Sequence, residues 1–181
     1  MTYMFRLKCF LLATFVFILA LSGSGQANQT HTTKNNLYKC TPCGNECDKA
    51  EYSEPGICTH CNMPMVIKST IHFKTIEPEK ICDYISTYPS VILLDVRTKE
   101  EFEGKANPDF GTLQHAINIP VQELESRLDE ISNLKTKEII VYCSHSHRSP
   151  RASYILTQNG FKNVTNMAGG MSVLRSNECK K

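Results

Sequence analysis

The chain has 181 residues, enough for one ordinary domain and a small additional module, and nine of them are cysteines. Its formal net charge is +2, and once Arg6 and Lys8 are set aside the acidic and basic side chains are equal in number. This balance argues against the basic surface of a nucleic-acid-binding protein, so we expect no nucleic-acid partner.

The first 27 residues have the organisation of a cleaved export signal. A basic start precedes an apolar stretch from Cys9 to Leu21, and small residues allow cleavage after Ala27. The stretch is shorter than the roughly 20 residues that span a bilayer, so no stable membrane span is expected after cleavage; an uncleaved anchor is the alternative. We therefore expect an exported protein, periplasmic if the source is bacterial. Residues 28–37 are polar and predict a flexible spacer.

A cysteine-rich module is predicted at residues 38–67. Its apolar content is too low for a core of its own, so its cysteines must hold it together. Two C-x-x-C knuckles separated by fourteen residues can supply the four thiolates of a tetrahedral metal site, although disulfides are the alternative in an exported protein. The predicted metal ligands are Cys40, Cys43, Cys58 and Cys61, with Cys47 or His60 as a substitute ligand.

Part of this module is similar to a small heavy-metal-binding domain found near copper and zinc efflux components. The similarity is carried by Tyr38-x-Cys40 and by Pro55-Gly56-x-Cys58-x-x-Cys61-x-Met63, with Cys43 where the family has a histidine. The resemblance implies a bound metal, and zinc is our first choice for four thiolates. Met63 and Met65 add soft sulfur that would favour Cu(I) at an exposed site; packing against the knuckle is the alternative role for both.

Residues 70–176 alternate between helix-like and strand-like segments, and a basic tail follows at 177–181. In chain order, we predict a helix at 77–86, strands at 91–94 and 116–119, a helix at 122–131, a strand at 138–142, a helix at 150–158 and a strand at 163–166. The apolar runs at 91–94 and 138–142 are typical of parallel strands covered on both faces. The predicted fold class is α/β, with a central parallel sheet flanked by helices.

The segment after the strand at 138–142 contains the best candidate nucleophile of the chain, Cys143. It leads into a predicted helix, so the thiol lies at the carboxyl end of the sheet, where backbone N–H groups and Arg148 would stabilise a thiolate, a persulfide or an anionic substrate. The other residues of the predicted substrate-binding loop are Ser144, His145, Ser146, His147 and Ser149. The two histidines could tune the thiolate, shuttle a proton or bind a metal, or simply be solvated.

This loop resembles the active-site loop of the rhodanese family, C-x-x-G-x-R-S, at Cys143, Arg148 and Ser149. Three further segments are similar to the family's other signatures: Leu94–Arg97 with Glu100–Phe102, Gly111–Pro120, and Gly169–Met171. Ser146 stands where the family usually has glycine, and a positive φ at that position would make the serine strained. The resemblance implies a rhodanese-like fold.

The activity that the resemblance implies is sulfur transfer by double displacement. Cys143 would take a sulfane sulfur from a donor such as thiosulfate, hold it as a persulfide, and pass it to a thiol, a cyanide-like acceptor or a protein thiol. Arg148 and the loop amides would hold the negative charge, and no cofactor is required. Four residues separate Cys143 from Arg148, one fewer than in related phosphatases and arsenate reductases, which favours sulfur over phosphate.

Two alternative functions follow from the same residues. The chain could be a metal-binding or metal-sensing protein whose rhodanese scaffold is catalytically idle, or a thiol or persulfide relay between Cys143 and the N-terminal cysteines or a partner protein. Cys82 and Cys179 are further candidates for resolving a Cys143 persulfide as a disulfide. Asp95 and Arg97 are interpreted as structural, through an ion pair with Glu100 or Glu101.

Overall fold

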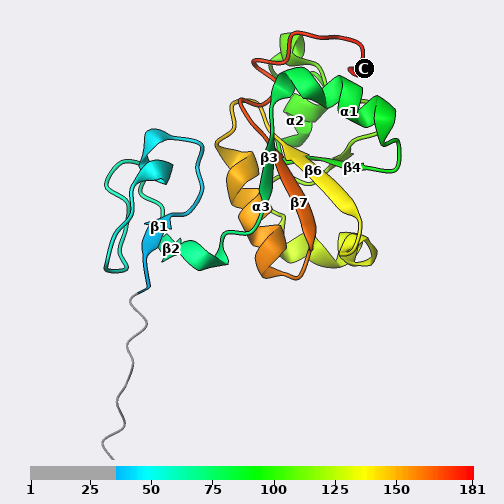
Figure 1. Ribbon diagram of the computed structural model, residues 1–181. Coiled ribbons are helices and arrows are strands. Elements are labelled where there is room, and N and C mark those ends of the chain that lie inside the picture. The colour runs from blue at the N-terminus through cyan, green and yellow to red at the C-terminus, as the bar shows by residue number, and fades with distance from the viewer. Residues whose placement is uncertain (1–35) are drawn as a thin grey trace, which may run out of the picture. The chain divides into compact units, whose positions relative to one another are not determined.

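The computed structural model describes residues 36–181, and the predicted export signal and residues 28–35 of the predicted spacer lie outside this part. Five parallel strands form the central sheet, in the order β3-β7-β6-β4-β5 (Figure 1). Their bounds are β3 Lys74–Ile76, β4 Ile92–Asp95, β5 Ile117–Asn118, β6 Glu138–Tyr142 and β7 Asn163–Met167. The predicted α/β class with a central parallel sheet is confirmed.

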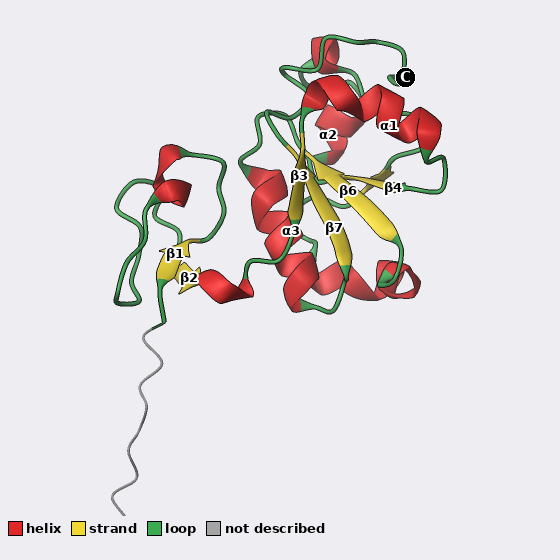
Figure 2. Cartoon of the chain, viewed as in Figure 1, coloured by secondary structure: helices red, strands yellow, loops and turns green. Residues whose placement is uncertain are grey.

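Helices cover both faces of this sheet (Figure 2). One face packs against α3 (Arg148–Gln158) and the 3-10 helix η5 (Glu125–Leu134), and the other packs against α1 (Ile81–Thr87) and the C-terminal segment. The remaining helical elements are α2 (Lys99–Phe102) and the 3-10 turns η1 (Glu46–Lys49), η2 (Lys68–Thr70), η3 (Pro78–Lys80) and η4 (Pro108–Phe110). Among residues 36–181, none of the helices has the length and hydrophobicity that a membrane span requires.

The sequence pattern located most elements of the sheet domain but not their type in every case. The segment predicted as a helix at 122–131 is instead the 3-10 helix η5, and near its start the Arg127 N–H is shared between the carbonyls of Glu123 and Leu124. Strand β3 was not predicted, because its first two residues, Lys74 and Thr75, are exposed at the sheet edge and give no apolar run.

The cysteine-rich module has its own small sheet. Strands β1 (Tyr38–Cys40) and β2 (Met65–Ile67) pair antiparallel, with Cys40 opposite Met65. The segment after β2 is hydrogen-bonded to helix α3. The Thr70 hydroxyl lies 3.2 Å from the Tyr154 hydroxyl, and Gln158 donates to the Thr70 carbonyl at 2.9 Å. Module and sheet domain belong to one compact unit of the fold.

A disulfide joins Cys82 in α1 to Cys179 near the C-terminus, with 5.2 Å between their Cα atoms. The bond closes a long chain loop and holds the last residues of the chain against helix α1. Because the two sulfurs are bonded to each other, neither is a free thiol that could resolve a persulfide on Cys143.

Candidate functional site

Cys143 follows β6 directly, at the carboxyl end of the central strands, and its side chain is 1% exposed. The Cys143 thiol donates to the Ser149 hydroxyl at 3.4 Å. The helix α3 begins at Arg148, so the intervening residues wrap from the strand into the helix N-terminus. This is the position in open α/β sheets where ligands meet the ends of the strands.

The loop between Cys143 and Arg148 has backbone N–H groups that, in the described part of the chain, donate no hydrogen bond. Within residues 36–181, no backbone carbonyl or side chain accepts a hydrogen bond from the N–H groups of Ser144, His145, Ser146 or His147. Unpaired N–H groups ahead of a helix N-terminus form a site for negative charge. The loop can therefore stabilise a thiolate, a persulfide anion or an anionic donor.

The segment similar to the family's closing motif, Gly169–Met171, lies against the carbonyl groups at the start of the loop. Met171 and Ser172 donate their N–H groups to the carbonyls of Cys143 and Ser144 at 2.8 and 2.9 Å. A Cβ atom at Gly170 would lie 2.5 Å from both of those carbonyl oxygens. Only glycine permits this approach, so the closing motif fixes which way the loop carbonyls point and leaves its N–H groups on the other side.

Arg148 is anchored by Glu101 of α2. Its guanidinium donates to the two carboxylate oxygens at 2.6 and 2.8 Å, and Ser144 donates to the same carboxylate at 2.7 Å. The Arg148 guanidinium holds the pKa of Glu101 at about 2, below its ordinary 4.5, against the opposing effect of burial. The predicted charge-holding residue Arg148 is thus part of an ion pair that ties the loop to α2.

Sequence reasoning missed this role of Glu101. The available signal was the T-x-x-E pattern that begins at Thr98, because it predicts a capping box at a helix start. The structure contains that box: the Thr98 hydroxyl accepts from the Glu101 N–H, and the Glu101 carboxylate accepts from the Thr98 N–H. The box orients the carboxylate that receives Arg148.

Asp95 and Arg97 form a buried ion pair with each other, with 2.7 Å between the closest oxygen and nitrogen. Arg97 also donates to the Gly111 carbonyl and the Thr112 hydroxyl, which ties β4 to the following loop. The structural interpretation of this pair agrees with these contacts. The predicted ion pair with Glu100 or Glu101 was wrong, because Arg97 pairs with Asp95 and Glu101 pairs with Arg148.

The side chains at the centre of the loop point in different directions. Ser146 has φ +61°, the left-handed region that glycine adopts readily, so a serine at this position is strained. The His145 ring is exposed and packs edge-on against Phe110, with 5.4 Å between ring centroids. The structure therefore does not bring His145 and His147 together as a pair.

His147 instead contacts the cysteine-rich module. Its Nδ1 lies 2.9 Å from the carbonyl oxygen of Cys43, an acceptor, so Nδ1 carries the proton. At the next residue, a Cβ on Gly44 would collide with the carbonyl oxygen of Ser146, and Gly44 has φ +76°. A glycine at this turn is required for the module to pack its backbone directly on the loop.

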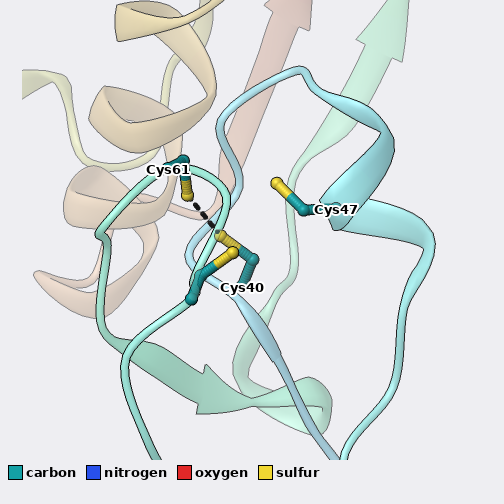
Figure 3. Close-up of side chains that lie close together, drawn as sticks. Cys40, Cys47 and Cys61 are labelled. Atoms are coloured by element: carbon teal, nitrogen blue, oxygen red, sulfur yellow. Dashed lines mark hydrogen bonds between the residues drawn. The ribbon is translucent and has the colours of Figure 1, made fainter.

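The module gathers four thiols into one cluster. The sulfur atoms of Cys40, Cys47, Cys58 and Cys61 all lie within 4.8 Å of one another. Figure 3 shows the sulfurs of Cys40, Cys47 and Cys61 turned toward a common centre, and those of Cys40 and Cys61 are 3.0 Å apart. Zn–S bonds of about 2.3 Å in a tetrahedron place sulfurs about 3.8 Å apart, so these residues fit a zinc ion.

This set differs from the predicted one at a single ligand. Cys47, named as a substitute ligand, takes the place of Cys43, because the turn η1 brings it back over Cys40. The Cys43 sulfur lies 3.4 Å from that of Cys47 and 3.3 Å from Asp48, in a second, overlapping group formed by Cys40, Cys43, Cys47 and Asp48. His60 is exposed and belongs to neither group.

The cluster places its thiols in unequal environments. Hydrogen bonds from the backbone N–H groups of Cys61 and His60 lower the pKa of Cys58 to about 7, whereas burial raises the pKa of Cys47 to about 12 and that of Cys40 further. A bound cation would displace the protons from all four sulfurs, because thiolates are the form that binds metal.

Comparison with known proteins agrees with the fold. A family model described as "Rhodanese-like domain" matches residues 78–177. The uncharacterized protein YqhL of Bacillus subtilis is 36% identical over 88 residues, which is 49% of this chain and 64% of YqhL. The tRNA uridine(34) hydroxylase of Photorhabdus laumondii is 27% identical over 118 residues, 59% of this chain and 32% of the hydroxylase. The chain thus spans less than two thirds of either relative.

A solved structure from Staphylococcus saprophyticus superposes with a TM-score of 0.50, covering 60% of this chain and 99% of that one at 24% sequence identity. At this identity the likeness concerns the fold of the sheet domain alone.

Proposed function

Because this chain belongs to the rhodanese-like domain family, we propose that it is a sulfurtransferase that carries sulfane sulfur as a persulfide on Cys143. The observation that supports the proposal most is the position of the Cys143 thiol at the end of β6, beside a loop whose N–H groups have no acceptor in residues 36–181. These donors are matched to the negative charge that sulfur transfer places on the outer sulfur.

In the first half-reaction, the Cys143 thiolate attacks the outer sulfur of a donor such as thiosulfate. The bond between the two donor sulfurs breaks, sulfite leaves with its electron pair, and the persulfide anion stays on Cys143. In the second half-reaction, a thiolate or cyanide attacks the outer sulfur and the Cys143 thiolate is released. No electrons are gained or lost overall, and no cofactor takes part in either step.

The loop residues serve these steps in different ways. The N–H groups of residues 144–147 hold the charge of the donor and of the persulfide, and the Ser149 hydroxyl accepts a hydrogen bond from the Cys143 thiol. Arg148 contributes positive charge at the loop while its ion pair with Glu101 fixes the loop's path. We therefore assign Arg148 a role in positioning as well as in charge stabilisation.

Small molecules are the proposed substrates, and a protein thiol is a further proposed acceptor. The hydroxylase activity in the name of the tRNA-modifying relatives is not carried over, because this chain spans only 32% of the Photorhabdus protein and its acidic and basic residues are balanced. Export, to the periplasm in a bacterium, is also proposed, and the Cys82–Cys179 bond supports it because disulfides persist in oxidising compartments.

A second function, metal binding or sensing by the cysteine-rich module, is favoured by the four thiols within 4.8 Å of one another. Zinc is the proposed metal, and Cu(I) is the alternative because all four ligands are soft. This function is compatible with sulfur transfer and would stand alone if the loop proved inactive.

The test is intact-mass spectrometry after thiosulfate treatment, together with cyanide-dependent thiocyanate release. Wild-type protein and the Cys43→Ala variant should gain an adduct of about 32 Da and turn over, whereas Cys143→Ala should do neither. Absence of adduct and turnover in folded wild-type protein with reduced Cys143 would contradict the proposal and leave the metal-binding function.

A further inference from the structure

A cavity of about 280 Å³ lies between the cysteine-rich module and the loop that carries Cys143. The module side includes Cys43, Asn45 and Met63, and the opposite side includes His147, Arg148 and Arg151 of the loop and helix α3. The cavity therefore requires both parts of the chain, and the sheet domain alone would leave this side of the loop open.

The charged side chains that line the cavity are all basic. Two arginines and a histidine face the cavity, and no carboxylate lines it. Arg148 is already paired with Glu101, but Arg151 is exposed and, among residues 36–181, makes no salt bridge. The cavity thus offers an unneutralised guanidinium, which pairs well with a carboxylate.

The size of the cavity indicates what kind of anion it holds. At about 30 Å³ per water molecule in the liquid, its volume equals roughly nine waters, more than an inorganic anion needs. Apolar atoms of Met63 and Val121 also line it, which suits an organic ligand. A ligand bound there lies against His147 and Arg148, on the same loop as Cys143.

We propose that this cavity binds the acceptor, a small thiol that carries carboxylate groups, with the cysteine-rich module as the specificity-determining wall. This inference rests on the proposed sulfur transfer. The acceptor thiolate attacks the outer sulfur of the Cys143 persulfide, the sulfur–sulfur bond to Cys143 breaks, and the acceptor leaves as its own persulfide while Cys143 returns to the thiolate. Arg151 binds the carboxylate of the acceptor, and Asn45 contributes an uncharged polar side chain to the module side of the lining.

The test compares two thiols as acceptors in the full-length, zinc-loaded protein: reduced glutathione, which is anionic, and 2-mercaptoethanol, which is neutral. Asn45→Asp places a negative charge in the wall and Arg151→Gln removes the positive one, so each should raise the KM for glutathione about fivefold. The KM for 2-mercaptoethanol and kcat should not change.

Matched controls separate the cavity from general effects of charge. Asn62→Asp adds the same charge to the module, next to a cluster thiol but outside the lining, and Arg175→Gln removes an exposed arginine elsewhere. Both should leave the KM for glutathione unchanged, with zinc content verified in every variant. Equal KM values for Asn45→Asp, Arg151→Gln and wild type, or a parallel rise for 2-mercaptoethanol, would overturn the inference.

A binding measurement keeps this inference separate from the proposed function. Calorimetric titration of glutathione into the Cys143→Ala protein requires no sulfur transfer, and Arg151→Gln in that background should weaken binding about fivefold. If wild-type protein transfers no sulfur but this weakening is found, the proposed function fails and the cavity stands as a site for anionic thiols. If Cys143→Ala protein binds no glutathione, the cavity proposal fails even if sulfur transfer is active.

Discussion

The carboxylate of Glu101 accepts two hydrogen bonds from the guanidinium of Arg148, at 2.6 and 2.8 Å, across 47 residues of sequence. The pair connects α2 to the first residue of α3. It therefore holds the loop in the conformation that leaves its N–H groups available.

Replacing Glu101 by glutamine should disturb this loop. The Glu101→Gln variant should lose about 2–3 kcal/mol of unfolding free energy, because Arg148 keeps its charge without a partner. The rate of thiocyanate formation should fall about ten- to hundredfold, since small misplacements of reacting groups are costly. The neighbouring Glu100→Gln change, at an exposed residue outside this pair, should alter neither quantity; equal effects of the two changes would contradict the role of the pair.

Acid should remove the same interaction. The folded-state pKa of Glu101 is about 2 and its ordinary value is 4.5, so the ionised carboxylate stabilises the folded protein above pH 4.5, and this contribution is lost as the pH falls toward 2. The difference in unfolding free energy between wild type and Glu101→Gln should be greatest near neutral pH and shrink below pH 4.5. Denaturant titrations at pH 3, 5 and 7 measure it, and a difference independent of pH would refute the assignment.

Replacing Ser146, whose backbone is strained, should raise the stability of the folded protein rather than lower it. Its φ of +61° costs a serine about 1 kcal/mol relative to glycine, so Ser146→Gly should raise the thermal midpoint by about 2–4 °C. Ser86→Gly, inside helix α1, should lower it, because glycine is the weaker helix former. A lower midpoint for Ser146→Gly would mean that the loop is not strained at this residue.

The parts of the site that sequence could predict are those encoded locally. Cys143, Arg148 and Ser149 share one strand-loop-helix segment, so their spacing alone placed them at the end of the sheet. Contacts between distant segments gave no such signal: the Glu101 pair and the approach of Gly44 to Ser146 depend on how the chain folds back.

The thiol cluster shows the same limit. The x2 spacing predicts Cys43 as a ligand, whereas in the four-thiol cluster the 3-10 turn η1 places the sulfur of Cys47 with those of the other three predicted ligands, and that turn is not visible in the pattern.

The metal ligands can be assigned by comparing two single substitutions. Cys47→Ser removes a member of the four-thiol cluster and should lower zinc affinity at least tenfold, whereas Cys43→Ser should retain one zinc per chain. Competition with a chromophoric chelator measures both affinities. The reverse order would favour the ligand set predicted from the knuckle spacing.

Removing the metal should act on the loop as well as on the module. The module has a cluster of only three buried cysteines as its core, so a chelator should unfold it and break the bond between His147 Nδ1 and the Cys43 carbonyl. The imidazole nitrogen signals of His147 in an NMR spectrum should then shift, whereas the backbone amide signals of β6 should not and serve as the internal control. Unchanged imidazole signals of His147 after complete zinc removal would show that the contact with Cys43 does not depend on the metal.

The disulfide between Cys82 and Cys179 should stabilise the sheet domain without taking part in catalysis. It closes a loop with a sequence separation of 97, and restricting so long a loop in the unfolded chain is worth about 2–4 kcal/mol. The double variant Cys82→Ala, Cys179→Ala should therefore unfold at lower denaturant concentration, while the mass adduct on Cys143 after thiosulfate treatment persists. Loss of the adduct in a folded sample of this variant would instead give one of the two thiols a role in sulfur transfer.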